Sequence, residues 1–151
     1  MRRVDAAADG DRARDAYATG FPSIDKWLGG GLRRGDLVVL GGDVQSGKSA
    51  LALAMALRMA QLAIPAVYFS GEMSGERIME RALAIEGRAR VDDLRQGSLD
   101  VFTRASVGGA AVRFREAFPT IAAFPPGGGV EALAAEIRRT LEVQVIFVDS
   151  L

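Results

Sequence analysis

Two residue types with versatile chemistry are absent from this 151-residue chain, which contains no cysteine and no histidine. Without cysteine, disulfide bonds, thiolate zinc sites and cysteine nucleophiles are excluded. Without histidine, imidazole bases and histidine-ligated metals are excluded as well. Any acid–base chemistry must therefore use carboxylates.

The chain also lacks a charge excess and a long uninterrupted apolar run. Its 19 basic and 19 acidic residues cancel, so no overall basic field indicates a nucleic-acid partner, although a local patch would serve for one. The N-terminus has no apolar segment typical of a signal peptide. The most apolar run, 51–69, is broken by Arg58, Gln61 and Pro65, which indicates a buried helix and a strand. We therefore expect a cytoplasmic protein with no membrane partner.

The most informative stretch matches the phosphate-binding pattern G-x-x-x-x-G-K-[ST], known as the P-loop. Its residues are Gly42, Asp43, Val44, Gln45, Ser46, Gly47, Lys48 and Ser49, followed by Ala50. The apolar run 37–40 before it predicts a strand, and the run 50–63 after it predicts a helix. Strand, glycine-rich turn and helix is the context that such a loop requires. The sequence therefore predicts that these nine residues bind a nucleotide.

Each part of the loop has its own role. Gly42 and Gly47 allow the backbone to approach a phosphate closely, and N–H groups at a helix start favour an anion. Lys48 supplies a positive charge to the β- and γ-phosphates, and the Ser49 hydroxyl is placed to bind Mg²⁺. Of the 19 basic residues only Lys26 and Lys48 are lysines, and a compact ammonium suits a tight loop better than a guanidinium. The alternative, a plain glycine-rich turn, is disfavoured by this combination.

The rest of the chain predicts strands that alternate with helices. Segment 1–18 is polar, so we expect a disordered tail or linker before an ordered unit over 19–151. Ser23 is predicted to be the N-cap of a short helix that carries Ile24, Trp27 and Leu28. Trp27 is expected to be a packing anchor rather than a platform for base stacking. Strands are predicted over 66–70, 120–124 and 143–149. Helices are predicted over 75–86 (capped by Ser74), over 91–96, over 99–117 (interrupted or weakened at Gly108 and Gly109), and in the segment that carries Val130, Leu133, Ile137 and Leu141. This alternation indicates an α/β fold with a parallel sheet.

Two carboxylates directly follow predicted strands. Asp149 ends the last strand, at the edge where ligands bind in open α/β sheets, and would hold Mg²⁺. Glu72 follows the strand over 66–70, where it would polarise the water that attacks the γ-phosphate. The alternatives are a turn-capping role for Asp149 and a helix-dipole role for Glu72. Glu76 and Glu80 are expected to be solvated charges on a helix surface.

With these features the chain resembles the RecA-like ATPases, and most closely the C-terminal ATPase domain of DnaB-type replicative helicases. The segments that carry the resemblance, besides the P-loop, are TGFPSID at 19–25, GLRRGDL at 31–37, FSGEMS at 69–74, Arg81-Ala82, LRQG at 94–97 and the last strand with Asp149. The resemblance covers 19–151. It implies a RecA-like P-loop NTPase with a mainly parallel sheet and helices on both faces.

The resemblance also implies roles for particular residues. Lys48 and Ser49 match the phosphate-binding lysine and the Mg²⁺-binding hydroxyl, Glu72 the catalytic glutamate, and Asp149 the aspartate of the Walker B strand. Lys48 and Glu72 are thus the predicted catalytic residues, Ser49 and Asp149 the predicted metal ligands, and ATP and Mg²⁺ the predicted cofactors. Members of the family form rings with ATP between subunits and translocate on DNA. A hexameric homo-oligomer, single-stranded DNA as partner and ATP-driven unwinding are therefore implied.

Other features of the sequence leave alternatives open. The stretches GGGL at 29–32, GGD at 41–43 and VDS at 148–150 are more similar to RadA recombination ATPases and KaiC-like proteins. Because family members continue past the Walker B strand to DNA-contacting loops and an arginine finger, we expect a truncated core with an unfinished sheet at its C-terminus. The alternatives are a RadA- or KaiC-like recombination or regulatory ATPase, and a nucleotide-binding module without turnover.

Overall fold

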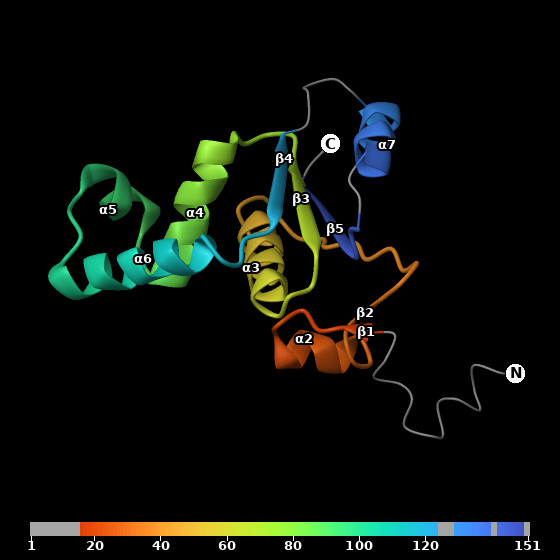
Figure 1. The fold of residues 1–151 in the computed structure, drawn as a ribbon, viewed down its shortest axis with the longest axis horizontal. Helices are drawn as coiled ribbons and strands as arrows, with labels where there is room; N and C mark the ends of the chain where they lie inside the picture. The colour runs from red at the N-terminus through yellow and green to blue at the C-terminus, as the bar shows by residue number, and fades with distance from the viewer. Residues whose placement is uncertain (1–15, 124–128, 140–141, 150–151) are drawn as a thin grey trace, which may run out of the picture.

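A three-stranded parallel sheet forms the centre of the fold (Figure 1). In this computed structural model, which describes residues 16–123, 129–139 and 142–149, β3 (Ala66–Ser70) lies between β4 (Thr120–Ala123) and β5 (Val145–Asp149). Every residue of β3 is buried, as expected of a central parallel strand. The predicted bounds of β3 are confirmed. β5 begins at Val145 rather than at 143, and the predicted end of β4 at 124 lies outside the described residues.

Helices cover both faces of this sheet, which confirms the predicted fold class. The helices are α2 (Pro22–Trp27), α3 (Lys48–Gln61), α4 (Gly75–Gly87), α5 (Val91–Gln96), α6 (Val101–Phe114) and α7 (Gly129–Arg139). Successive side chains of a strand point to opposite faces. Tyr68 accordingly packs with α3, α4 and α6 in one core cluster, whereas Val67 and Phe69 pack with Leu133 of α7 in a second cluster. The predicted residue Leu141, beyond α7, lies outside the described residues.

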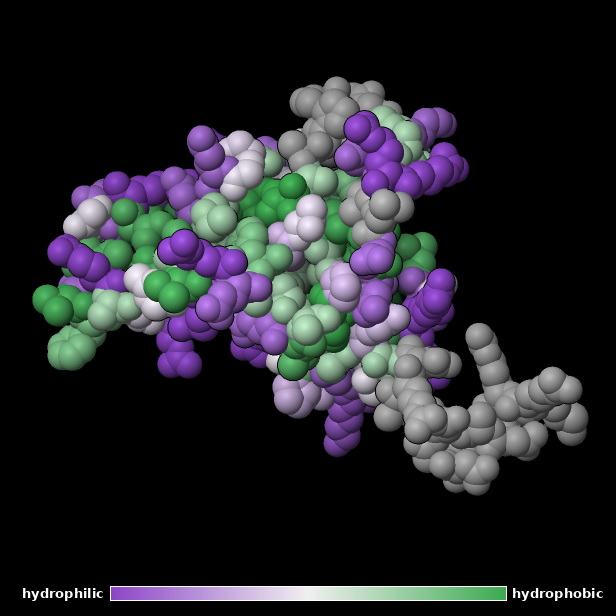
Figure 2. Space-filling view, viewed as in Figure 1, coloured by the Kyte–Doolittle hydropathy of each residue, from purple (hydrophilic) through white to green (hydrophobic). Residues whose placement is uncertain are grey.

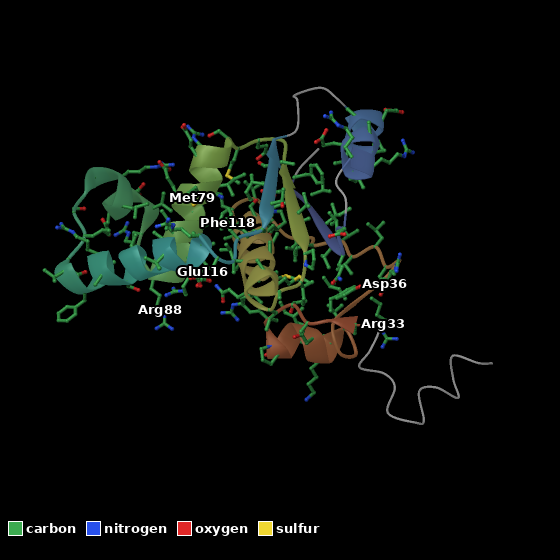
Figure 3. The ribbon with its side chains drawn as sticks, viewed as in Figure 1. Arg33, Asp36, Met79, Arg88, Glu116 and Phe118 are labelled. Carbon is green, nitrogen blue, oxygen red and sulfur yellow. The ribbon has the colours of Figure 1, made fainter. Side chains whose placement is uncertain are left out.

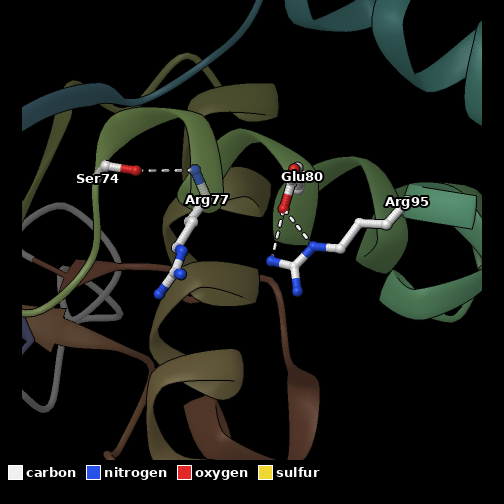
Figure 4. Close-up of polar contacts among 4 residues, drawn as sticks. All are labelled: Ser74, Arg77, Glu80 and Arg95. Carbon is white, nitrogen blue, oxygen red and sulfur yellow. Dashed lines mark hydrogen bonds and ion pairs between the residues drawn. The ribbon is translucent and has the colours of Figure 1, made fainter.

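α4 and α5 form where the sequence predicts them. The Ser74 hydroxyl accepts a hydrogen bond from the backbone N–H of Arg77 at 3.4 Å, which confirms the predicted N-cap (Figure 4). Glu80 is not the purely solvated charge that we predicted. Its carboxylate oxygen Oε2 accepts hydrogen bonds from Nε and Nη2 of Arg95, at 2.8 Å and 2.7 Å, and so links α4 to α5. Both side chains are partly exposed, so this ion pair contributes at most about 1 kcal/mol.

α6 differs from its prediction because it is continuous through Gly108 and Gly109. It begins at Val101 rather than at 99 because the Asp100 carboxylate caps it, accepting from the backbone N–H groups of Phe102 and Thr103. Each helical glycine costs about 1 kcal/mol relative to alanine, and tertiary packing against α4 offsets that cost.

The N-terminal elements require two corrections. β1 (Ala16–Tyr17) pairs antiparallel with β2 (Leu32–Arg33), so ordered structure begins before 19; segment 1–15 of the predicted tail lies outside the described residues. Ser23 is not the N-cap, because α2 begins at Pro22 with Phe21 in the N-cap position. Trp27 is 84% exposed, so it is not a packing anchor. The buried Thr19 holds this region instead, since its N–H and hydroxyl both donate to Asp25 Oδ1, at 2.8 Å and 2.7 Å.

The apolar run 37–40, predicted to be a strand, has no regular structure. Its side chains are exposed, from 44% at Leu40 to 90% at Leu37. The described sheet has the order β4-β3-β5, and the run pairs with none of these strands within the described ranges. A turn lies before the run, with the Asp36 N–H donating to the Arg33 carbonyl at 3.0 Å, and Figure 3 shows both side chains beyond β5.

The surface is mixed in polarity. On the face shown in Figure 2, apolar (green) side chains are exposed among charged (purple) ones, including at the end of the molecule formed by α5 and α6. Val101 and Phe102 at the start of α6 are 78% and 87% exposed. None of the helices in the described ranges combines the length and the apolar composition that crossing a bilayer requires.

Candidate functional site

The glycine-rich loop, which we define as residues 42–49, leads directly into α3. Gly47 adopts a left-handed conformation (φ 90°) immediately before the helix, and α3 therefore begins at Lys48 instead of 50. A Cβ atom at Gly42 would lie 2.7 Å from Oγ of Ser46, so the loop folds back on itself where a side chain does not fit. The result is a tight turn at the N-terminus of a long helix, which is a favourable place for an anion.

Lys48 closes this loop with its ammonium group. Its Nζ donates hydrogen bonds to the carbonyl oxygens of Gly42 and Asp43, at 2.9 Å and 2.7 Å. The ammonium is thus held over the start of the loop by two neutral acceptors, and these contacts are exposed to solvent. A charged phosphate oxygen would be a stronger acceptor than either carbonyl.

The two predicted metal ligands lie in contact, although they are 100 positions apart in the sequence. The Ser49 hydroxyl donates to Oδ1 of Asp149 at 2.8 Å. Both groups present oxygen atoms with lone pairs left over, which are the hard ligands that Mg²⁺ prefers. Within the described ranges no three acidic side chains cluster to hold a metal by themselves. The pair therefore fits a Mg²⁺ ion that takes its remaining ligands from phosphates and water.

Tyr68 completes this contact, and the sequence analysis did not identify it. Its hydroxyl donates to the second carboxylate oxygen of Asp149, Oδ2, at 2.7 Å. Burial raises the pKa of the Tyr68 phenol, and so do the hydrogen bond to Asp149 and the negative charge of that carboxylate, while the positive charge of Arg81 acts in the opposite direction. The phenol therefore remains a hydrogen-bond donor. The available signal was a hydroxyl in an otherwise apolar buried strand, since such a group needs a partner.

Glu72 lies at the same edge of the sheet but not in the same contact. The turn that carries it is fixed by two hydrogen bonds: Gly71 N–H donates to the Asp149 carbonyl at 3.3 Å, and Met73 N–H to Oγ of Ser70 at 3.0 Å. The Glu72 side chain is exposed and makes no hydrogen bond or ion pair with the described part of the chain. Its carboxylate therefore does not stabilise the described part of the fold through a hydrogen bond or an ion pair.

An open hollow lies at the opposite, amino-terminal end of the strands. It has a volume of about 290 Å³ and is lined mainly by apolar residues, together with the carboxylates of Glu116 and Glu142. Figure 3 shows Glu116 and Phe118 on the segment that leads into β4. Because Ser49 and Asp149 meet at the carboxyl ends of the strands, this hollow is separate from the candidate site.

Comparisons with known proteins show which family the chain is similar to. The family model described as "DnaB-like helicase C terminal domain" matches residues 16–151. The replicative DNA helicase DnaB of Treponema pallidum is 35% identical over 138 residues, covering 89% of this chain and 31% of that protein. The DNA repair protein RadA of Mycobacterium tuberculosis (strain H37Rv) is 39% identical over 89 residues, covering 59% of this chain and 18% of that protein. The chain thus spans less than a third of the length of these relatives.

Solved structures show the same fold at low sequence identity. One solved ATPase domain superposes with a TM-score of 0.79 at 18% identity, covering 99% of this chain and 55% of that chain. A DnaB-like replicative helicase, solved in a study of its interactions with primase, gives a TM-score of 0.79 at 16% identity and covers 98% of this chain and 36% of that chain. The RecA-like fold expected from the sequence is confirmed. Because the family model matches nearly the whole described chain, the protein belongs to the DnaB-like helicase C-terminal domain family.

Proposed function

We propose that this chain is the ATP-binding and ATP-hydrolysing core of a DnaB-type replicative DNA helicase. The observation that carries the proposal is the hydrogen bond between Ser49 and Asp149. It joins a loop with the phosphate-binding pattern to the carboxylate that ends β5. Membership of the helicase domain family and the similarity to a replicative helicase support the same function.

The proposed mechanism assigns one task to each residue. Lys48 leaves the loop carbonyls and binds phosphate oxygens, together with the N–H groups at the start of α3. Ser49 and Asp149 would hold Mg²⁺, which would supply positive charge to offset the charge of the phosphates. Glu72 accepts the proton of the attacking water from the adjacent turn.

The helicase proposal extends beyond one chain. In a hexameric ring, nucleotide would bind between neighbouring subunits, and single-stranded DNA would be the polymer along which the ring moves. Binding to DNA backbone phosphates should weaken steeply with salt, because it releases counterions. Analytical ultracentrifugation with and without nucleotide measures the ring, and DNA affinity at two salt concentrations measures the contact.

The first experiment is a calorimetric titration of the chain with a non-hydrolysable ATP analogue, with and without Mg²⁺. We expect saturable, Mg²⁺-dependent binding by the wild type and none by Lys48→Ala. The matched control is Lys26→Ala in α2, which removes the only other lysine and should bind like the wild type. Wild-type affinity in Lys48→Ala would contradict the assignment of the loop.

A RadA-type recombination ATPase is the second candidate. The observation that favours it is the 39% identity to RadA of Mycobacterium tuberculosis, although over only 89 residues. A third outcome is a module that binds nucleotide without turnover. Phosphate release measured with and without single-stranded DNA, beside strand displacement on a forked duplex, separates the three. Stimulated release with displacement supports the helicase, stimulated release alone supports the RadA-type enzyme, and binding without release supports the module.

A further inference from the structure

The buried phenol of Tyr68 is the strongest feature that the predicted nucleotide chemistry does not use. Tyr68 lies in the middle of β3 with 0% of its surface exposed. Its hydroxyl donates to Oδ2 of Asp149 at 2.7 Å, and the same hydroxyl oxygen lies 3.4 Å from the Ser49 carbonyl oxygen. A buried tyrosine that directs its one polar atom at a predicted metal ligand has a definite geometric role.

The two carboxylate oxygens of Asp149 are held from two different elements. Oδ1 accepts from the Ser49 hydroxyl in the first turn of α3, and Oδ2 accepts from Tyr68 in β3. Rotating the carboxylate about its Cβ–Cγ bond would break both hydrogen bonds at once. The plane of the carboxylate is therefore fixed relative to the glycine-rich loop.

The Tyr68 ring is itself rigidly placed. In the sheet register Tyr68 is paired with Phe147, two positions before Asp149 on the same face of β5. The Tyr68 and Phe147 rings stack with centroids 6.3 Å apart and planes 24° apart. The first core cluster, which includes Leu53 and Ile78, surrounds the ring. The phenol thus reaches Asp149 from a ring that is fully buried in the first core cluster.

We propose that Tyr68 is a positioning residue that sets the orientation of Asp149 for Mg²⁺. This inference rests on the proposed function, because it concerns the same predicted metal site. Each oxygen of Asp149 accepts one hydrogen bond from the chain and keeps a second lone pair for a metal ion or its water. Groups that orient metal ligands in this way change metal affinity by about 10- to 100-fold when they are removed.

The test is Tyr68→Phe, which removes the hydroxyl and keeps the ring and its stacking. We would measure the Mg²⁺ concentration needed for half-maximal binding of a non-hydrolysable ATP analogue, and the affinity for the analogue in EDTA. We expect the Mg²⁺ concentration for half-maximal binding to rise about 10- to 100-fold. The affinity in EDTA should be unchanged, because Lys48 would still bind the phosphates. Tyr17→Phe in β1 removes the chain's only other tyrosine hydroxyl and should change neither value.

A double-mutant comparison shows whether the phenol acts through Asp149. In an Asp149→Asn background, Tyr68→Phe should add no further change in the Mg²⁺ requirement. An unchanged Mg²⁺ requirement in the single variant, full additivity in the double variant, or an equal loss of affinity with Mg²⁺ and in EDTA would each overturn the role of Tyr68. A wild-type chain that binds no nucleotide, or binds it independently of Mg²⁺, overturns the proposed function itself before any variant is compared.

Discussion

At the scale of single residues, a substitution of Glu72 should affect ATP hydrolysis without affecting stability. Its side chain is exposed and makes no hydrogen bond or ion pair with the described ranges that a substitution could break. If Glu72 is the general base, Glu72→Gln should lower the rate of ATP hydrolysis about 100- to 10,000-fold and leave nucleotide affinity and the melting temperature unchanged. Phosphate release, calorimetry and thermal unfolding measure these three quantities.

The control for this substitution is Glu76→Gln, an exposed carboxylate in the first turn of α4. It removes the same charge four positions away and should leave the hydrolysis rate intact. If Glu72→Gln hydrolyses ATP as fast as Glu76→Gln does, another group accepts the proton.

Gly87 provides a second prediction at the residue scale. A Cβ atom there would lie 2.5 Å from Cγ2 and 3.0 Å from Cα of Val107, so α6 would have to move away from α4. Gly87→Ala should therefore lower the free energy of unfolding by about 1–3 kcal/mol, as overpacking does. Chemical denaturation monitored by circular dichroism measures the change.

Gly108→Ala is the matched control on the facing helix. A Cβ atom at Gly108 meets nothing within 4 Å, and the position is helical. The same substitution should there raise the free energy of unfolding by about 0.4–1 kcal/mol, because alanine favours the helix and restricts the unfolded chain. If both substitutions change the free energy of unfolding equally, the close approach to Val107 does not destabilise Gly87→Ala.

At the scale of elements, the stability that the Asp100 cap gives to the start of α6 should depend on pH. Hydrogen bonds from the Thr103 hydroxyl and from the backbone N–H groups of Thr103 and Phe102 lower the pKa of the Asp100 carboxyl. Because the folded pKa is below the unfolded one, the stabilisation is present above the ordinary carboxyl range and is lost as the pH falls through the folded pKa. Asp100→Ala should therefore lower the melting temperature at pH 7 and converge with the wild type in acid.

The informative comparison is Asp100→Asn, whose amide oxygen still caps the helix but does not titrate. Its melting temperature should exceed that of Asp100→Ala, and the difference between the two variants should stay nearly constant from pH 7 into acid. A wild-type advantage over Asp100→Ala that is undiminished in acid would contradict the role of the carboxylate.

Local signals explain which elements the sequence predicts well. The bounds of α5 match, and α4 begins where the Ser74 hydroxyl caps it, because a cap and an exit residue lie next to the helix they delimit. Two long-range effects could not be read locally. α6 continues through its glycines because α4 packs beside it, and the run 37–40 is not a strand because it pairs with no strand of the described ranges.

In the candidate site, too, local sequence signals predict some residues and long-range pairing determines another. The motif identifies Lys48 and Ser49, and strand-end position identifies Asp149, so the contact between the last two could be anticipated. Tyr68 could not be, since its role arises from the register in which β3 pairs with β5. Its hydroxyl reaches Asp149 only because that register places the carboxylate two positions beyond the stacked Phe147.

At the scale of the whole molecule, exposed apolar side chains and a formal net charge of zero favour self-association. Val39 is 82% exposed. Val39→Lys should reduce self-association in sedimentation velocity and change the free energy of unfolding by less than about 0.5 kcal/mol. Val112→Lys, at a 62% exposed position of α6, adds the same charge elsewhere. If both variants reduce self-association equally, the added charge alone, and not the run 37–40, governs the association.

The contact between Ser49 and Asp149 also has a consequence for the order in which the protein folds. The chain between them must close a loop of 100 residues, at an entropic cost of roughly 4 kcal/mol, before the hydrogen bond forms. α3 can form from neighbouring residues long before then. In refolding, helical circular dichroism should therefore recover ahead of Mg²⁺-dependent binding of a fluorescent ATP analogue. The capacity to bind nucleotide would then be a kinetic marker of the moment when β5 joins the sheet.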